Sequence, residues 1–228
     1  GVAFTGSDSR SSKLAFDKVA TKKIFRENGI LTPRDVVVEK QNFSGNRLKA
    51  AFGFPRVVKP SREGSSIGVR IVEWEADMAA ALAAAFERDN TVLVEEFIAG
   101  RELTGGIVGE RVLPVIEIRP KSGWFDYANK YTEGATEELV PAPIEPVIAH
   151  RVQKEALNAH QLLGCRDLSR SDFRVDAGGK TWILEVNTIP GMTATSLLPK
   201  AAAADGITFP NLCLALVEQA LNRGGQER

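Results

Sequence analysis

The residues most able to do chemistry together lie in one segment near the C-terminal end: Arg170, Asp172, Glu185 and Asn187. Two stretches of strand-forming residues, 170–175 and 182–187, flank a Gly178-Gly179 pair, a sequence typical of a β-hairpin. If these glycines form a two-residue turn, Asp172 lies opposite Glu185 and Arg170 lies opposite Asn187. The four polar groups then occupy neighbouring positions on two paired strands.

Side chains alternate along strands, so the four polar groups share one face of the hairpin. Two carboxylates and an amide oxygen beside an arginine repel one another unless a hard cation lies between them, and oxygen ligands suit Mg²⁺ that bridges phosphates. The alternative is a strand face that is merely solvated. The opposite face is expected to enter the core with Phe173, Leu184 and Val186.

A second candidate site is the loop 60–68, which follows the apolar strand 56–59 and is rich in Gly and Ser. Such a loop can place backbone N–H groups over phosphate oxygens while Lys59 supplies positive charge. It is not a P-loop, because no Gly-Lys-Ser/Thr sequence opens a helix. A flexible hairpin loop is the alternative reading, and Lys18, in the first helix, would on its own be read as a solvated lysine.

Two further features could contact a ligand. The polar loop 120–146 carries aromatic residues and glycine around 125–131, and a loop of this length can act as a lid that excludes water. Glu95 and Glu102 flank the connection between two predicted units, where they could meet an adenine amine or ribose hydroxyls. On chemistry alone, the reading of both as surface charges is the favoured one.

The order of predicted elements indicates two α+β units, with a boundary near 91–100 and a ligand between them. One helix is expected over 12–28, ending at Gly29. The remaining expected elements are a short helix over 46–52, strands over 36–38, 56–59, 69–72, 91–97, 102–108 and 112–119, helices over 75–88 and 147–163, the hairpin, and two terminal helices.

The composition describes an ordinary globular chain of 228 residues, 43% hydrophobic and 25% charged. Lys+Arg and Asp+Glu are 29 each, so net charge suggests no nucleic-acid partner, and no segment predicts a membrane span or a signal peptide. A cytoplasmic protein is expected. Cys165 and Cys213 are expected to be buried thiols, and His150 and His160 to be surface residues of one helix.

Six motifs in order resemble the D-alanine–D-alanine ligases of the ATP-grasp superfamily: residues 57–60, 63–68, 92–97, 129–131, 170–172 and 184–193. The resemblance covers nearly the whole chain. It implies an α+β ATP-grasp fold in which two α+β lobes hold the nucleotide between them. The implied domains are residues 1–10 as the tail of an N-terminal domain, 11–97 as the central lobe, and 98–228 as the C-terminal lobe with the metal site.

The resemblance implies that ATP phosphorylates the carboxylate of one D-alanine and that the amine of a second attacks the acyl phosphate, for peptidoglycan precursor synthesis. By similarity, the phosphate groups are met by Lys18, Lys59 and Lys130. Adenine and ribose are met by Glu95, Glu102, Phe97 and Ile98. Two Mg²⁺ ions, which Mn²⁺ could replace, are held by Asp172, Glu185 and Asn187.

The substrate side is likewise assigned by resemblance. Arg170 and the backbone N–H of Gly191 stabilise the tetrahedral oxyanion, and Ser196 receives the carboxylate of the second D-alanine. Ser65 and Tyr131 fix the mobile loop over the site, and a Lys-Tyr pair in that loop favours D-alanine over D-lactate. The family also suggests a homodimer, formed through an N-terminal domain that supplies a glutamate to the first D-alanine.

One substitution departs from the family pattern, since Glu96 stands where many relatives have lysine. Two alternatives to the dipeptide ligase stay open. One is a module that binds ATP and Mg²⁺ without ligase turnover, and the other is an ATP-grasp ligase for a different carboxylate and amine. The matches at Ser65, Tyr131 and Ser196 favour the D-alanine enzyme over the last of these.

Overall fold

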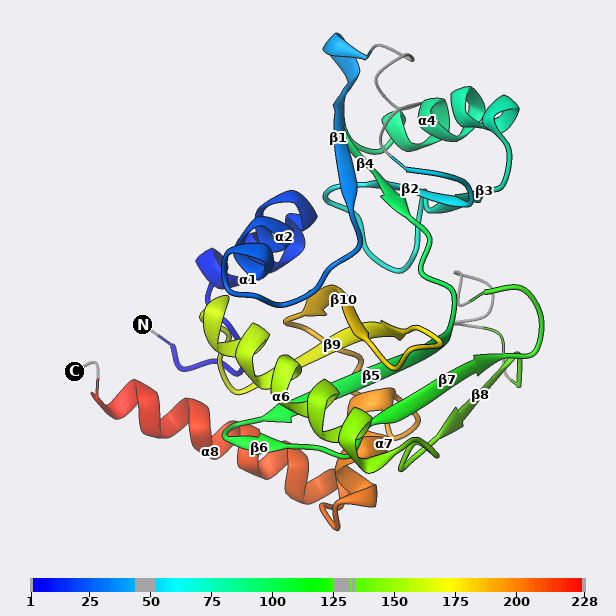
Figure 1. The fold of residues 1–228 in the computed structure, drawn as a ribbon. Helices are drawn as coiled ribbons and strands as arrows, with labels where there is room; N and C mark the ends of the chain where they lie inside the picture. Colours follow the sequence, from blue (N-terminus) through cyan, green and yellow to red (C-terminus); the bar gives the residue numbers. More distant parts are fainter. Residues whose placement is uncertain (1, 44–51, 125–131, 133, 227–228) are drawn as a thin grey trace.

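The computed structural model describes residues 2–43, 52–124, 132 and 134–226, which form two antiparallel sheets with helices packed against them (Figure 1). The smaller sheet has the strand order β1-β4-β2-β3. Its strands are β1 (Asp35–Glu39), β2 (Arg56–Pro60), β3 (Arg70–Val72) and β4 (Thr91–Glu96). The predicted α+β class is confirmed. The predicted helix over 46–52 lies largely outside the described residues.

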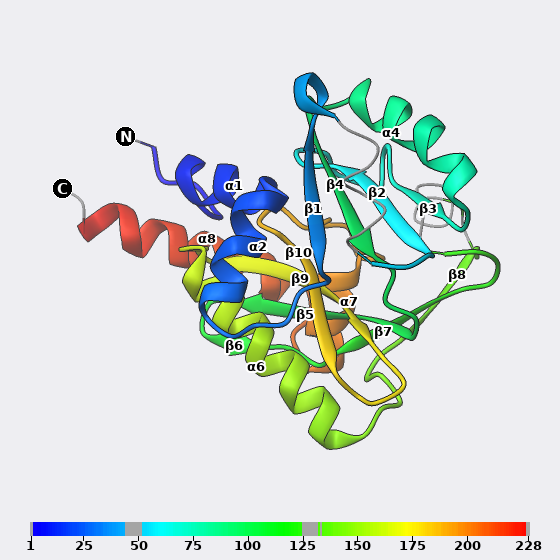
Figure 2. The same ribbon diagram turned by 45° about the horizontal axis from the view of Figure 1, so that its top comes forward.

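The two faces of the smaller sheet differ in polarity. One face packs Val58, Val92 and Val94 against α4 (Met78–Phe86), which follows the short 3-10 helix η2 (Glu75–Asp77). The opposite face carries Glu95 and Lys59, because side chains alternate along each strand. In both ribbon views, α4 lies on the far side of this sheet from α1 and α2 (Figures 1 and 2).

The first helical region consists of two helices, so the prediction of one helix over 12–28 was wrong. Helix α1 (Ser9–Phe16) and helix α2 (Lys18–Glu27) are separated by Asp17, whose backbone is extended and whose carboxylate accepts a hydrogen bond from the Ala20 N–H at 3.1 Å. A short acidic side chain that caps the second helix competes with continuing the first. The end at Gly29, with φ +73°, is as predicted.

The larger sheet has the strand order β10-β9-β5-β7-β8, with β6 paired to β5. Its strands are β5 (Arg101–Val108), β6 (Arg111–Val112), β7 (Ile116–Pro120), β8 (Thr136–Leu139), β9 (Leu168–Val175) and β10 (Thr181–Asn187). The predicted strand over 112–119 is therefore split between β6 and β7. Strand β8 occupies part of the region predicted as a polar loop, where it pairs with β7.

Helices cover both faces of the larger sheet. Helix α6 (Pro146–Leu162) packs on one face with Val152 and Ala156 in a core shared with Leu103 and Phe173. Helices α7 (Leu197–Ala204) and α8 (Phe209–Gln226) pack on the other face through a second apolar cluster. These two layers fix the strands that carry the predicted metal ligands. No helix of the described residues has the length and apolar character needed to cross a membrane.

The β9–β10 hairpin has the predicted register at its polar end, but its turn is longer than predicted and a shift in register compensates for the difference. Asp172 pairs with Glu185 and Arg170 with Asn187, as expected. The turn is nevertheless a three-residue loop, closed by a hydrogen bond from the Gly179 N–H to the Asp176 carbonyl at 2.9 Å, with Gly179 at φ +76°. Near the turn Ile183 pairs with Phe173, so the register shifts by one residue before Glu185.

This shift corrects one core prediction. Leu184, expected in the core, is half-buried and lines the pocket described below. Phe173 and Val186 are buried as predicted, and Ile183, which was not predicted there, is fully buried in the same cluster. A register shift of one residue changes which side chain faces the core, because the side-chain period of a strand is two.

The connection between the sheets, 97–100, runs close against β9. Gly100 has φ +140°, and a Cβ atom there would lie 1.9 Å from the Val175 carbonyl oxygen. Only glycine tolerates both this backbone conformation and this approach.

The histidine and cysteine predictions hold only in part. His150 is exposed, but His160 is buried and its Nδ1 lies 2.8 Å from Ser169 Oγ, so its surface assignment was wrong. His160 lies on the face of α6 that packs against β9. The ten-residue spacing between His150 and His160 does not show which of the two faces the sheet. Cys165 is buried with its pKa raised by burial to about 11, whereas Cys213 is half-buried.

Candidate functional site

A pocket lies between the two sheets, at the edge where α1–α2 and the connection 97–100 meet them. One part of its wall is apolar, and the other part is charged. The apolar wall includes Pro33, Val57, Ile71, Phe97, Ile98 and Leu184. The charged residues of the wall are Lys18, Lys59, Glu63, Glu95, Glu96, Glu102, Asp172, Arg174 and Glu185.

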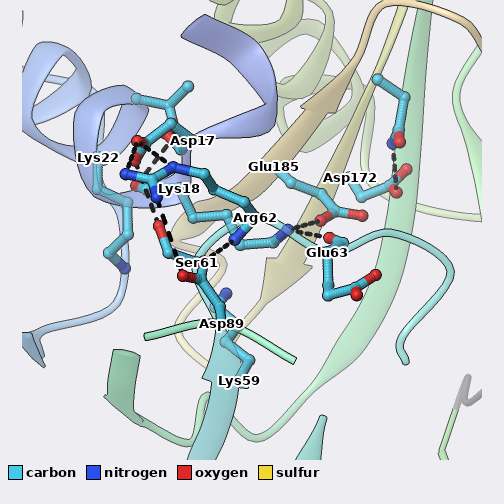
Figure 3. Close-up of polar contacts among 12 residues, drawn as sticks. Asp17, Lys18, Lys22, Lys59, Ser61, Arg62, Glu63, Asp89, Asp172 and Glu185 are labelled. Atoms are coloured by element: carbon cyan, nitrogen blue, oxygen red, sulfur yellow. Dashed lines mark hydrogen bonds and ion pairs between the residues drawn. The ribbon is translucent and has the colours of Figure 1, made fainter. Parts of the chain in front are cut away.

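The carboxylates Asp172 and Glu185 reach this pocket from neighbouring strands (Figure 3). Asp172 Oδ1 accepts hydrogen bonds from Arg170 Nε and from the hydroxyl of Thr104, each at 2.9 Å. Asp172 Oδ2 accepts from Arg170 Nη2 at 2.8 Å and from Asn187 Nδ2 at 3.2 Å. The amide nitrogen of Asn187 thus faces Asp172, and this hydrogen bond fixes the orientation of the Asn187 amide group.

The donor set fits a hard cation. It consists of two carboxylates on paired strands, which are oxygen donors of the kind that Mg²⁺ prefers, and the amide of Asn187, which has its nitrogen toward Asp172 and its oxygen as the third donor. Among the described residues, no group of three or more His, Cys, Asp or Glu side chains forms a candidate metal site. The fit therefore rests on two protein carboxylates, which is usual for Mg²⁺ that is also bound by substrate phosphates.

Lys18 lies across the pocket from β10 and connects three elements. It is buried, its Nζ lies 3.3 Å from Glu185 Oε2, and it donates a hydrogen bond to the Glu63 carbonyl at 2.6 Å (Figure 3). The break at Asp17 places Lys18 at the start of α2, where its backbone N–H also binds the Ser61 carbonyl at 3.2 Å. Lys18 is therefore a positioned cation, not a solvated lysine.

Lys59 projects from β2 into the same pocket and pairs with Glu95. Its Nζ lies 2.8 Å from Glu95 Oε2, and both residues are almost completely buried. Burial raises the pKa of Glu95, but the ammonium groups of Lys22 and Lys59 outweigh that effect and hold the pKa below its ordinary value. Glu95 is consequently a carboxylate buried among lysines, and the reading of it as a surface charge is excluded.

Glu102 is held by Arg174, which the sequence reasoning did not single out. Arg174 Nη1 lies 3.0 Å from Glu102 Oε2, its Nε donates to the Ile98 carbonyl at 3.1 Å, and its guanidinium lies over the Phe97 ring at 5.6 Å. One arginine thus contacts three of the four residues predicted to meet the nucleoside. Its position two residues beyond Asp172 on β9 was the available signal, since both side chains share one face.

The loop after β2 is anchored to neighbouring elements. Arg62 binds Asp17 through its Nε at 3.0 Å, Ser61 Oγ binds the same carboxylate at 3.2 Å, and the Arg62 N–H donates to Asp89 at 2.9 Å (Figure 3). Ser65 and Ser66 have φ of 51° and 59°. Non-glycine residues in this conformation are uncommon and cluster at functional sites. The loop is thus held in a defined conformation next to the pocket by these hydrogen bonds.

The structure brings eight of the predicted site residues into the lining of one pocket: Lys18, Lys59, Glu95, Phe97, Ile98, Glu102, Asp172 and Glu185. Arg170 and Asn187 adjoin it through Asp172. Ser65, Gly191 and Ser196 are outside this lining. Gly191 and Ser196 abut each other, since a Cβ atom at Gly191 would lie 2.8 Å from Ser196 Oγ. Lys130 and Tyr131 lie outside the described residues.

Comparison with protein families identifies residues 24–218 with the family described as "D-ala D-ala ligase C-terminus". The chain belongs to the D-alanine–D-alanine ligase family. It is 45% identical over 218 residues to the D-alanine–D-alanine ligase of Methylacidiphilum infernorum, covering 96% of this chain and 70% of that protein. It is 47% identical over 212 residues to the enzyme of Syntrophotalea carbinolica, covering 92% of this chain and 68% of that protein.

Solved structures of family members have the same fold. The D-alanine–D-alanine ligase from Bacillus anthracis, complexed with ATP, matches with a TM-score of 0.87 at 34% identity, covering 100% of this chain and 73% of that one. The VanG D-Ala:D-Ser ligase from Enterococcus faecalis also matches with a TM-score of 0.87 at 34% identity, covering 95% of this chain and 64% of that one. The ATP-grasp fold predicted from the motifs is thereby confirmed.

Proposed function

We propose that this chain carries the ATP-dependent ligation of two D-alanines for peptidoglycan precursor synthesis. In the proposed reaction, the carboxylate of the first D-alanine takes the γ-phosphoryl group of ATP and ADP leaves. The amine of the second D-alanine then attacks the acyl phosphate, the C–N bond forms, and inorganic phosphate leaves. The observation that carries the proposal is the pocket between the two sheets, which joins an apolar wall to paired cations and carboxylates.

The two ends of the pocket suit the two ends of ATP. A purine ring is flat and apolar on its faces, and the wall formed by Val57, Ile71, Phe97 and Leu184 offers it a matching surface. Glu102, fixed by Arg174, is placed to accept hydrogen bonds from ribose hydroxyls. We assign the adenosine to this end and residues 11–97 and 98–228 to the two lobes that enclose it.

The phosphates are assigned to the charged end, beside Lys18 and Lys59. Both ammonium groups are held by neighbouring carboxylates or carbonyls, so little conformational freedom is lost when they bind phosphate oxygens. Lys130 is proposed as the third phosphate ligand on the strength of the sequence motif. Electrostatic stabilisation of transferring phosphoryl groups by such cations is a major term in phosphoryl transfer.

Asp172, Glu185 and Asn187 would hold Mg²⁺, and two ions are proposed. When bound, the metal would supply charge neutralisation at the phosphate oxygens during transfer. The contribution of this chain is to keep the ligands in place. Arg170 and Thr104 fix the Asp172 carboxylate from two sides, and Lys18 fixes Glu185.

The acceptor side of the reaction is assigned to the segment after β10. Ser196 would bind the carboxylate of the second D-alanine, while Arg170 and the Gly191 N–H would stabilise the tetrahedral oxyanion. Ser196 is pre-positioned, since its Oγ accepts a hydrogen bond from the Thr193 N–H at 3.2 Å and lies 2.8 Å from Thr193 Oγ1. Ser65 and Tyr131 are proposed to hold the loops over the site.

A ligase that takes a second amino acid other than D-alanine is the alternative candidate. The D-Ala:D-Ser ligase matches this chain with the same TM-score and identity as the D-alanine–D-alanine ligase complexed with ATP. The shared fold therefore leaves the identity of the second substrate to direct assay.

The test is phosphate release by this chain from ATP and Mg²⁺, with and without D-alanine, with chromatographic detection of the dipeptide. D-serine and D-lactate serve as competing acceptors in parallel reactions. We expect phosphate release that depends on D-alanine and yields D-alanyl-D-alanine in equal amount. ATP binding without any acceptor-dependent release would contradict ligase activity of this chain and leave it as a nucleotide-binding module.

A further inference from the structure

We propose that Lys22 is a positioning residue that neutralises Glu95 and so leaves the charge of Lys59 available to nucleotide phosphates. The inference rests on the proposed ATP site, because Lys59 is assigned to phosphate there. Lys22 itself is completely buried, on the face of α2 that packs over the smaller sheet. Lys22 lies outside the six motifs that carry the family resemblance.

Lys22 is the centre of a buried charge network. Its Nζ lies 2.7 Å from Glu95 Oε1 and 3.4 Å from Asp35 Oδ1, and it donates a hydrogen bond to the Pro33 carbonyl at 2.8 Å. The other oxygen of Glu95 lies 2.8 Å from Lys59 Nζ. Glu95 is therefore bridged by two ammonium groups, one on each carboxylate oxygen.

The strand register explains why a lysine is needed at this point. Asp35 on β1 and Glu95 on β4 are directly paired, so two carboxylates lie side by side on one face of the sheet. Like charges directly opposite in a sheet are destabilising, and burying them makes the repulsion larger. Lys22 lies between the two, and Arg26 adds a second contact to Asp35 at 2.5 Å.

The charge balance decides what Lys59 can do. Lys22, Arg26 and Lys59 provide three cations against the two carboxylates Asp35 and Glu95, so the network carries one net positive charge. Lys59 is the cation of this set that lines the pocket. If Lys22 were neutral, Glu95 would be paired with Lys59 alone. The negative charge of Glu95 would then largely cancel the attraction of Lys59 for phosphate.

The titration behaviour agrees with this arrangement. Burial lowers the pKa of Lys22, and the positive charge of Lys59 lowers it further, whereas Glu95 and Asp35 oppose both effects. The pKa of Glu95 is held below its ordinary value by the two lysines against the effect of burial. The two lysines are therefore coupled through one carboxylate.

The experiment compares ADP with adenosine in four versions of this 228-residue chain: the unaltered protein, Lys22→Met, Lys22→Met with Glu95→Gln, and Lys23→Met. Mg²⁺-ADP affinity is measured by calorimetry, and adenosine affinity by NMR saturation-transfer titration, which detects millimolar binding. Lys23 is the matched control, since it is an exposed neighbour on the same helix that pairs only with Glu27 at 3.9 Å among the described residues. Thermal unfolding is recorded for each protein.

We expect Lys22→Met to weaken ADP about tenfold and adenosine less than twofold, because removing one nearby unit charge acts on the phosphates. The double variant should restore the preference for ADP over adenosine, since Lys59 is then released from Glu95. Lys23→Met should change neither affinity. A purely structural role for Lys22 would instead weaken both ligands equally, so the ratio of the ADP and adenosine affinities would be the same in Lys22→Met as in the unaltered protein.

Two outcomes separate failure of this inference from failure of the proposed function. If the unaltered chain binds neither ADP nor adenosine, the nucleotide site itself is wrong. If it binds both and the ratio is unchanged in Lys22→Met, only the role of Lys22 is wrong. Should Lys22→Met fail to fold, Glu95→Gln alone must raise the preference for ADP, and an unchanged ratio in that variant overturns the inference.

Discussion

Replacement of Gly100 by alanine tests the packing that joins the two sheets. The new Cβ atom would lie 1.9 Å from the Val175 carbonyl oxygen, and the residue would have to keep φ at +140°. The backbone strain costs about 1–3 kcal/mol. Displacing β9 or the connection to relieve the overlap costs about 1–3 kcal/mol more. With a shift of about 2–4 °C per kcal/mol for a chain of this size, we expect the Tm to fall by roughly 10 °C in differential scanning calorimetry.

Gly29→Ala is the matched control for that experiment. Gly29 has φ +73°, but no atom lies within 4 Å of the Cβ position, so the variant carries the backbone strain without the overlap. Its cost should be about 1–2 kcal/mol. A Gly100→Ala protein whose Tm equals that of Gly29→Ala would refute the tight contact between the connection and β9.

The other two predictions concern the metal ligands and the buried histidine. Glu185→Ala should lower Mg²⁺-dependent phosphate release more than about 100-fold, which exceeds the effect of losing a residue that only supports a metal ligand. Its Tm should change little, because the Glu185 side chain is partly exposed. The control is Glu87→Ala at an exposed site, and turnover retained in Glu185→Ala would refute the metal assignment. Burial lowers the pKa of His160 from 6.5, so the unfolded chain takes up the proton first. The contribution of His160 to the free energy of unfolding should therefore be constant above about pH 6.5 and decrease as the pH falls below it. His160→Gln should remove that decrease in urea titrations at pH 5 to 7 and His150→Gln should not, and equal pH slopes in all three proteins would contradict the burial of a neutral imidazole.

The pairing at the polar end of the hairpin was predictable because it depends only on residues close together in the sequence. Alternation along two strands and a glycine-rich turn suffice to place Asp172 opposite Glu185, and the structure has that pairing. The length of the turn and the bulge before Glu185 were not predictable in this way. A two-residue turn and a three-residue turn followed by a bulge give the same register at Glu185 but opposite orientations for Leu184. The consequence is that a predicted core residue lines the pocket instead.

The helix boundaries show where apolar periodicity is overridden. Residues 12–28 carry a helical pattern, yet Asp17 ends one helix and caps the next. A capping aspartate is visible in the sequence, but in a helical pattern it is equally consistent with a solvated side chain. The break matters for function because it places Lys18 at the first turn of α2, facing Glu185.

Residues that act through long-range contacts escaped the sequence reasoning. Lys22 and Arg174 acquire their positions from sheet registers and from helix packing that bring segments more than 70 residues apart into contact. Charged residues in isolation are usually exposed, so no local feature distinguished Lys22, and Arg174 was marked only by its position two residues beyond Asp172 on β9. His160 was misplaced for the same reason, since its burial depends on which face of α6 meets β9.

The transfer of oxygen from D-alanine to phosphate tests the central proposal most directly. This chain is incubated with ATP, Mg²⁺ and D-alanine labelled with ¹⁸O in its carboxylate, and the released phosphate is analysed by mass spectrometry. An acyl phosphate intermediate requires one carboxylate oxygen to leave with the phosphate, so we predict one ¹⁸O per phosphate released with each dipeptide formed. Phosphate that contains no ¹⁸O would mean that ATP is hydrolysed by water in this pocket, and the ligase account would be wrong.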